Sequence, residues 1–174
     1  MPAPENPQKI ISISPLKWNS LKSFIDLRHE IEADAAHLVP KRGERKDSII
    51  YTVGRFMANR RRTQILVATN DKRFVGYISV IFAKFRKLKG NAYLALSVSP
   101  KYRNRGIGTE LMLAAEKFAK EHGVRRLELE VFGKNEKAIN LFKRLGYEEE
   151  GRRREAVRDE DGFDDVIFMA KFLN

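Results

Sequence analysis

The stretch Val98-Ser-Pro-Lys-Tyr-Arg-Asn-Arg-Gly-Ile-Gly-Thr109 joins an apolar segment that ends at Val98 to an amphipathic segment that begins at Gly106. Backbone N–H groups at the start of a helix have no partners within the helix, and the helix dipole adds positive potential there. The two glycines let an anion approach this backbone closely, and Arg103 and Arg105 add positive charge beside it. The stretch therefore predicts a strand–loop–helix junction that binds a phosphate group. A tight turn without a ligand is the alternative.

Two other phosphate-binding motifs do not match this junction. A dinucleotide-binding fingerprint needs a third glycine where this chain has Leu111, and the Gly-Lys-Ser/Thr sequence of a P-loop does not occur in the chain. Because Gly-x-Gly also arises by chance, a binding role needs support from a second part of the sequence.

Strand and helix patterns alternate on both sides of the junction. Apolar residues at helical spacing predict helices, with Trp18 on the apolar side of the first, and short apolar or alternating runs predict strands, with Gly76 at a bulge or close approach. The expected strands cover 10–13, 64–69, 74–85, 92–98, 127–131, 147–157 and 163–173, and the expected helices cover 16–31, 47–60, 106–122 and 135–145. The order β-α-α-β-β-β-α-β-α-β-β predicts one α/β or α+β domain, 10–174, with helices flanking a mixed central β-sheet. An irregular tail, 1–9, precedes it.

Composition excludes several classes of protein. The 174 residues contain no cysteine, which rules out disulfides, thiolate zinc sites and cysteine nucleophiles, and the three histidines have no metal-ligand spacing, so no metal is expected. No apolar run approaches the roughly 20 residues that cross a bilayer, so no membrane is expected. The first seven residues lack the pattern of a secretory signal, and a cytoplasmic location fits the composition. The net charge of +11 favours a well-solvated surface together with a phosphate-rich cofactor, because the basic residues are spread along the chain. Nucleic acid is not favoured, because the sequence shows no basic stripe interleaved with aromatic residues.

The second supporting segment is Asn135-Glu-Lys-Ala-Ile-Asn-Leu-Phe-Lys-Arg-Leu-Gly-Tyr147, which follows the junction after one more strand. It is similar to the Asn-x-x-Ala-x-x-Leu-Tyr-x-x-x-Gly-Phe helix of the GCN5-related N-acetyltransferase (GNAT) family. The junction is similar to that family's pyrophosphate loop, Arg/Gln-x-x-Gly-x-Gly/Ala, with Arg103, Gly106 and Gly108 in place. The resemblance covers roughly 64–172, and the segments 150–154 and 161–169 resemble the branch of ribosomal-protein and small-amine acetyltransferases.

The resemblance implies a single-domain GNAT-like fold and a site for acetyl-CoA. Residues at three places would bind this cosubstrate: Leu96, Ser97 and Val98 along the pantetheine arm; Arg103, Asn104, Arg105, Gly106, Ile107, Gly108 and Thr109 at the pyrophosphate; and Asn135 and Phe142 on the later helix. The Val98 amide would point at the thioester oxygen and stabilise the oxyanion that forms there. Asn135 would touch the cofactor, cap its helix, or do both.

The resemblance also assigns proton transfer, with one departure from the family's pattern. Glu130 stands at the position that often takes a proton from the acceptor amine; a solvated glutamate paired with an arginine is the alternative, and Glu128 shares its face. The family's general acid is a tyrosine where this chain has Phe142, so either water protonates the thiolate or no acid is needed. Phe142 is then expected to pack against the cofactor or the core, and Tyr147 to lie in the core.

The implied function is N-acetyl transfer from acetyl-CoA to a primary amine by direct attack. A small amine, an amino acid, a polyamine and a protein N-terminus all remain open as acceptors, and a homodimer remains open too. The acceptor would enter between 31–60 and the final two strands, where Glu30, Glu32 and Asp34 would attract a cation or simply be solvated. The competing hypothesis is a non-catalytic module on the same fold that binds acyl-CoA or a polyanion.

Overall fold

The computed structural model describes residues 11–33, 58–59, 61–159 and 162–174. The expected tail and nearly all of the expected helix at 47–60 lie outside these ranges. Within them the chain forms a seven-stranded sheet in the order β1-β2-β3-β4-β5-β7-β6. The strands are β1 (Ser12–Pro15), β2 (Thr63–Asn70), β3 (Arg73–Phe82), β4 (Asn91–Val98), β5 (Arg126–Phe132), β6 (Glu148–Asp159) and β7 (Gly162–Phe172).

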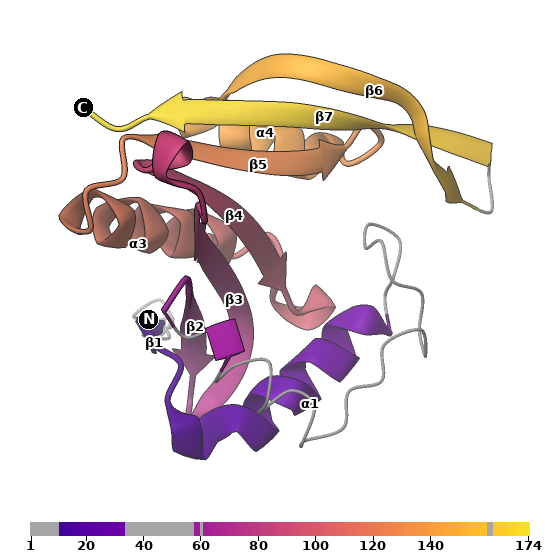
Figure 1. Ribbon diagram of the computed structural model, residues 1–174. Helices are drawn as coiled ribbons and strands as arrows, with labels where there is room; N and C mark the ends of the chain where they lie inside the picture. Colours follow the sequence, from indigo (N-terminus) through magenta and orange to yellow (C-terminus); the bar gives the residue numbers. More distant parts are fainter. Residues whose placement is uncertain (1–10, 34–57, 60, 160–161) are drawn as a thin grey trace, which may run out of the picture.

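In the described part of the chain, three helices flank this sheet: α1 (Leu21–Glu32), α3 (Ile107–Glu121) and α4 (Glu136–Arg144). α3 packs against β2, β3 and β4, and α1 packs against β3 (Figure 1). All neighbouring strands are antiparallel except β4 and β5, which run parallel. The α/β architecture with a mixed sheet that the sequence predicts is confirmed.

The main core lies between α3 and the sheet. α3 buries the row that its 3.6-residue period places on one side, and Leu111, Met112 and Ala115 are fully buried. Gly106 and Gly123 bound this helix with φ angles of +80° and +73°, a conformation that favours glycine. A smaller cluster beneath α1 includes Phe24. The helix predicted over 106–122 is therefore confirmed to within one residue at each end.

The first helix differs from its expected range. The Leu16 N–H donates to the Ile65 carbonyl oxygen at 2.8 Å, so the chain is still paired with the sheet where the helix was expected to begin. A short 3-10 turn follows, and α1 begins only at Leu21. Trp18 lies in that turn and is 55% exposed, so its expected place on the apolar side of the helix is wrong.

Two predictions about the strand over 74–85 can be compared with the structure: where it ends, and the close approach at Gly76. β3 ends at Phe82, three residues early, because the chain turns into a 3-10 segment at Arg86–Leu88, and Phe85 is exposed. The close approach expected at Gly76 is confirmed: a Cβ atom there would lie 3.1 Å from the Ser97 carbonyl oxygen, and the β2–β3 register shifts beside it.

Candidate active site

The sheet opens between its two parallel strands. β4 and β5 pair only from Asn91–Arg126 to Tyr93–Glu128, and beyond this point the two strands diverge (Figure 1). α3 follows the end of β4 and α4 follows the end of β5, so the gap lies between two strand–helix connections. This is the place in an open α/β sheet where ligands commonly bind.

The backbone of β4 presents unpaired groups to this opening. The Ser99 N–H donates to the Val75 carbonyl oxygen at 2.9 Å, and the Ala83 N–H donates to the Asn91 carbonyl oxygen at 3.1 Å, so the odd-numbered residues of β4 bond to β3. Because successive residues of a strand point their N–H groups in opposite directions, the amides of Leu96 and Val98 face the opening. Among the described residues, β4 thus carries hydrogen-bond donors without a β5 partner beyond Tyr93.

The loop after β4 has the geometry of an anion site. Asn104 and Gly106 both adopt left-handed backbone conformations, with φ angles of +60° and +80°, and α3 begins at the next residue. The amides of Ile107, Gly108 and Thr109 form the first turn of α3, where N–H groups lack partners within the helix. All three residues line the cavity described below, so their amides are placed where they could bind a phosphate group.

Gly108 has a second role, in packing. A Cβ atom at this position would lie 3.2 Å from Leu141 Cδ2 and 3.6 Å from Leu96 Cδ2. Gly106 differs, because a Cβ atom there would meet nothing within 4 Å. Its left-handed backbone and the open space beside it explain that glycine, whereas contact between α3 and α4 explains Gly108.

A cavity of about 650 Å³, the loop cavity, lies at this junction. Every residue predicted to bind acetyl-CoA lines it except Arg105 and Phe142. It also receives residues that the sequence did not single out: Ile31, Tyr102, Lys134, Glu136, Lys137, Ala138, Leu141 and Arg144. Lys134 and Lys137 lie on either side of Asn135 in the sequence, and this positive charge near the start of α4 was a signal from which their place in the site could have been predicted. Ile31 comes from α1 and is the first residue of the segment 31–60 that was expected beside the acceptor entrance, although no role in binding acetyl-CoA was expected for it.

The two loop arginines occupy different positions. Arg103 lines the loop cavity, and its Nε donates to the Val98 carbonyl oxygen at 3.2 Å, which holds the guanidinium on the open side of β4. Arg105 does not line the cavity; its guanidinium lies over the ring of Tyr102, 5.3 Å from the centroid. The structure therefore places Arg103 inside the expected site and the Arg105 side chain beside it.

Asn135 lies where α4 meets the opening. Its Oδ1 accepts a hydrogen bond from the Ala138 N–H at 3.2 Å, so the side chain caps the helix. The same residue lines the loop cavity and the neighbouring cavity described next. The predicted cap is confirmed, and a cofactor contact remains a prediction.

A second cavity, the strand cavity of about 360 Å³, lies between the diverging strands. It shares Ile31, Leu96, Ser97, Asn135 and Ala138 with the loop cavity, so the two are ends of one cleft. Glu130 of β5 lines the strand cavity and Glu128 does not. Glu128 instead accepts hydrogen bonds from Arg126 Nε at 2.7 Å and Asn91 Nδ2 at 3.3 Å. The two glutamates, which the sequence placed on the same face, therefore differ in the structure: Glu128 is held by Arg126 and Asn91, and Glu130 faces the cleft.

Tyr93 lies beside Glu130 on the wall of the strand cavity. Burial raises the pKa of its hydroxyl, and the nearby Glu130 carboxylate raises it further. Tyr93 therefore keeps its proton at neutral pH and presents a polar group to this end of the cleft. The sequence did not single it out, because one tyrosine in an apolar strand has no distinctive pattern.

Phe142 and Tyr147, the two aromatic residues of the segment 135–147, lie close together. Phe142 is 6% exposed, and its ring centroid lies 6.1 Å from that of Tyr147, which is 2% exposed. Phe142 lines the strand cavity and not the loop cavity. Burial raises the pKa of Tyr147, and the nearby Glu116 carboxylate raises it further. Tyr147 thus lies in the core as predicted, and Phe142 packs there with one side toward the cleft.

The acidic residues expected near the acceptor entrance have separate environments. Glu32 lines the strand cavity and lies 3.6 Å from Arg28 in an ion pair. Glu30 accepts hydrogen bonds from Ser99 Oγ at 2.9 Å and from the Arg73 guanidinium at 2.6 Å, so it fastens α1 to the end of β4. Asp34 lies outside the described residues.

The described residues contain no group of three or more His, Asp or Glu side chains placed to hold a metal ion. None of the helices in the described ranges has the length and apolar character needed to cross a bilayer.

Comparison with known proteins identifies the family. The model of the acetyltransferase (GNAT) family matches residues 26–147. The N-alpha-acetyltransferase of Sulfurisphaera tokodaii is 37% identical over 92 residues, which cover 48% of this chain and 55% of the relative. The ribosomal protein bS18 alanine N-acetyltransferase of Escherichia coli is 36% identical over 75 residues, which cover 43% and 51%. The chain thus spans about half the length of these curated relatives.

A solved structure extends the likeness to the whole fold. The YncA structure from Salmonella typhimurium, determined with its cofactor acetyl-CoA, superposes with a TM-score of 0.83 over 94% of each chain at 16% sequence identity. The family model covers more than half of the sequence, and the residues it matches include the glycine loop and the strands β4 and β5. The chain belongs to the acetyltransferase (GNAT) family.

Proposed function

We propose that this chain is an acetyl-CoA-dependent N-acetyltransferase that transfers an acetyl group to a primary amine by direct attack. The observation that carries the proposal is the single cleft, which has unpaired backbone amides at one end and the Glu130 side chain at the other. The two ends meet where β4 and β5 separate, so that a bound acyl group and an amine can come together there.

The loop cavity suits acetyl-CoA in size and charge. Its volume of about 650 Å³ lies within the range of small-molecule sites. The amides of Ile107, Gly108 and Thr109 would hold the pyrophosphate, and the side chains of Arg103, Lys134, Lys137 and Arg144 would add positive charge around it. The pantetheine arm contains amide groups, and these can pair with the free edge of β4 as a neighbouring strand would.

Three groups of this chain would act on the reacting atoms. Acetyl-CoA supplies an acyl group activated as a thioester. The Val98 N–H would donate a hydrogen bond to the acyl oxygen as negative charge grows on it. Glu130 would accept a proton from the attacking amine, directly or through water. Phe142 has no proton to donate, and a thiolate whose conjugate thiol has a pKa of about 8.5 leaves without an acid.

We propose a protein or peptide N-terminus as the acceptor. Two relatives named above act on such amines according to their names. The strand cavity carries the carboxylates of Glu32 and Glu130, which favour a cationic ammonium group, and the Arg28 guanidinium, which pairs with Glu32. The chain therefore offers negative charge at the end of the cleft where the acceptor would enter.

Thiol release from acetyl-CoA tests this proposal. The full chain is incubated with acetyl-CoA and a short peptide whose only amine is its N-terminus, and the same peptide carrying an Nα-acetyl group is the matched control. We expect thiol release with the free peptide alone. Release only with free amino acids or polyamines would overturn the acceptor class. Release at background with every amine, despite tight binding of acetyl-CoA in calorimetry, would overturn the enzyme and favour a binding module.

A further inference from the structure

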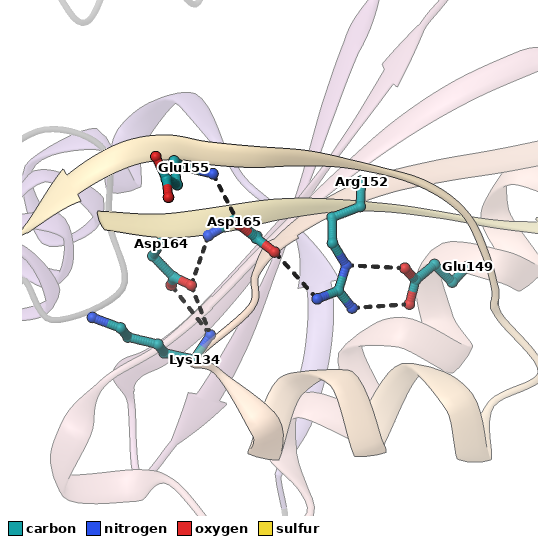
Figure 2. Close-up of polar contacts among 6 residues, drawn as sticks. All are labelled: Lys134, Glu149, Arg152, Glu155, Asp164 and Asp165. Carbon is teal, nitrogen blue, oxygen red and sulfur yellow. Dashed lines mark hydrogen bonds and ion pairs between the residues drawn. The ribbon is translucent and has the colours of Figure 1, made fainter. Parts of the chain in front are cut away.

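The loop between β5 and α4 is fastened to the start of β7 through Asp164 and Asp165. Both carboxylate oxygens of Asp164 lie 3.2 Å from the Lys134 N–H, which donates to them (Figure 2). The Gly133 N–H donates to the Asp165 carbonyl oxygen at 2.9 Å. A loop that carries no secondary structure of its own is therefore held from the neighbouring strand at two successive amides.

Gly133 is what allows this close approach. A Cβ atom on Gly133 would lie 3.0 Å from Asp164 Oδ1 and 3.4 Å from Asp165 Cβ. The shorter distance is one that real Cβ atoms rarely adopt, so any larger residue would push the Asp164 carboxylate away from the Lys134 amide. The glycine and the carboxylate therefore work as one contact.

The fastened loop carries the wall of the cleft opposite β4. Lys134 lines the loop cavity, and the next residue, Asn135, lines both cavities while its side chain caps α4. The Lys134 amide precedes that cap, so a shift of this amide moves the first turn of α4. The contacts of Asp164 thus reach the cleft through two consecutive residues, although Asp164 itself does not line it.

Asp165 contacts β6, the neighbour of β7 on the side away from β5. Between the pairs Arg153–Val166 and Val157–Asp164, three residues of β6 oppose Asp165 alone, and Glu155 in this bulge has a φ of +51°. The Glu155 N–H donates to Asp165 Oδ1 at 2.9 Å, and Arg152 donates to Oδ2 at 3.2 Å (Figure 2). Asp165 therefore closes the bulge of β6 and keeps the start of β7 in place beneath the loop.

We propose that Asp164 is a positioning residue for acetyl-CoA: by accepting the hydrogen bond of the Lys134 amide, it sets the place of Lys134 and Asn135 on the wall of the loop cavity. This inference rests on the proposed function, because acetyl-CoA is taken to occupy that cavity. It assigns Asp164 no contact with substrate and no part in proton transfer. Its effect is on binding of the cofactor and not on the chemical step.

Calorimetric titration of the full chain with acetyl-CoA tests the inference. We expect Asp164→Ala to weaken binding roughly fivefold, the size of one lost hydrogen bond to a charged acceptor that is partly exposed. Asp164→Asn keeps an acceptor oxygen and should restore binding to within twofold. Glu148→Ala, which removes an exposed carboxylate from β6, is the matched control and should bind as the wild type does.

A double-mutant cycle with Gly133 separates a local contact from general destabilisation. Gly133→Ala should weaken binding of acetyl-CoA in the wild-type background and have less than a twofold effect in Asp164→Ala, because the contact is already lost there. In steady-state kinetics, KM for acetyl-CoA should rise while kcat and KM for the amine stay within twofold. A merely structural role would lower kcat with the fraction of folded protein.

The outcomes distinguish this inference from the proposed function. Wild-type protein that does not bind acetyl-CoA would overturn the proposed function and the inference together. Wild-type protein that binds acetyl-CoA, with Asp164→Ala binding equally well, would overturn the inference alone. A loss in Asp164→Asn as large as in Asp164→Ala, or additive effects in the cycle, would also overturn it.

Discussion

The two ends of the cleft are built in different ways. The loop cavity is formed largely by backbone: the amides at the start of α3, two left-handed residues at Asn104 and Gly106, and the free edge of β4. The strand cavity is lined by residues from α1, α3, α4, β3, β4 and β5, among them the side chains of Glu130 and Tyr93. A backbone site tolerates change in most of its side chains, whereas a side-chain site can change specificity by one substitution. The difference suits a common cosubstrate at one end and a particular acceptor at the other.

The largest expected effect is at the side-chain end. Glu130→Gln should lower kcat about hundredfold, the usual size of a lost general base, and leave the Kd for acetyl-CoA within twofold because Glu130 does not line the loop cavity. The loss of kcat should be greatest at low pH, where the largest fraction of the acceptor amine is protonated. Steady-state kinetics across a pH series would measure both changes.

Glu128 supplies the control for that experiment. It lies two residues away on β5, held by Arg126 and Asn91 outside the cleft, so Glu128→Gln should change kcat less than twofold. Equal losses in the two variants, or a pH–rate profile of Glu130→Gln parallel to that of the wild type, would remove Glu130 as the base.

At the backbone end, Gly106→Val should weaken binding of acetyl-CoA about thirtyfold. A β-branched residue at a φ of +80° costs roughly 2 kcal/mol, and its side chain would fill the open space beside the loop. Gly123→Val is a matched control, because Gly123 has a φ of +73°, also meets nothing within 4 Å, and lies at the other end of α3. Calorimetry should show weakened binding of acetyl-CoA in Gly106→Val alone. Equal affinities of the two variants would mean that backbone strain, and not a place in the binding site, is the reason for a glycine at position 106.

The smallest effect concerns Glu30, which fastens α1 to the end of β4. Burial raises the pKa of Glu30, but the Ser99 hydroxyl, the Arg73 guanidinium and Lys101 outweigh this and hold the pKa below its ordinary value. A carboxyl whose pKa is lowered on folding stabilises the protein above its unfolded pKa, and the stabilisation is lost as the pH falls through the folded pKa.

Glu30→Gln should therefore lower the free energy of unfolding by about 1 kcal/mol at pH 7. The difference should shrink as the pH falls below about 4, because wild-type Glu30 is then protonated. Urea unfolding at a series of pH values would measure it, with the exposed Glu148→Gln as reference. A difference that stays constant with pH would show that the carboxylate charge is not what holds α1 to β4.

The features predictable from the sequence are those that backbone conformation dictates. Gly106 and Gly123 mark the ends of α3, and Asn135 marks the start of α4, because left-handed caps and side-chain caps admit few residue types. The alternation over 127–131 marks β5 for a similar reason, since its period of two matches a half-buried strand. These local rules locate most of the loop cavity.

The features that could not be predicted depend on contacts between distant segments. Nothing in 91–98 signals that β4 leaves β5 after Tyr93, because the pairing is decided by both strands and by the helices that follow. Ile31 and Arg28 reach the cleft only because α1 packs on β3. The prediction for Trp18 was wrong for a related reason. Pairing with β2 keeps the chain extended in the part of the sequence where apolar residues at helical spacing already predicted a helix.

If the backbone amides along the opening between β4 and β5 hold acetyl-CoA, binding should change their NMR resonances. In a titration of ¹⁵N-labelled protein with acetyl-CoA, we expect the largest shifts at Val98, Ile107, Gly108 and Thr109, and no shift at Gly123 at the far end of α3. Unchanged resonances at those four amides, with acetyl-CoA shown to bind, would contradict this role of the amides.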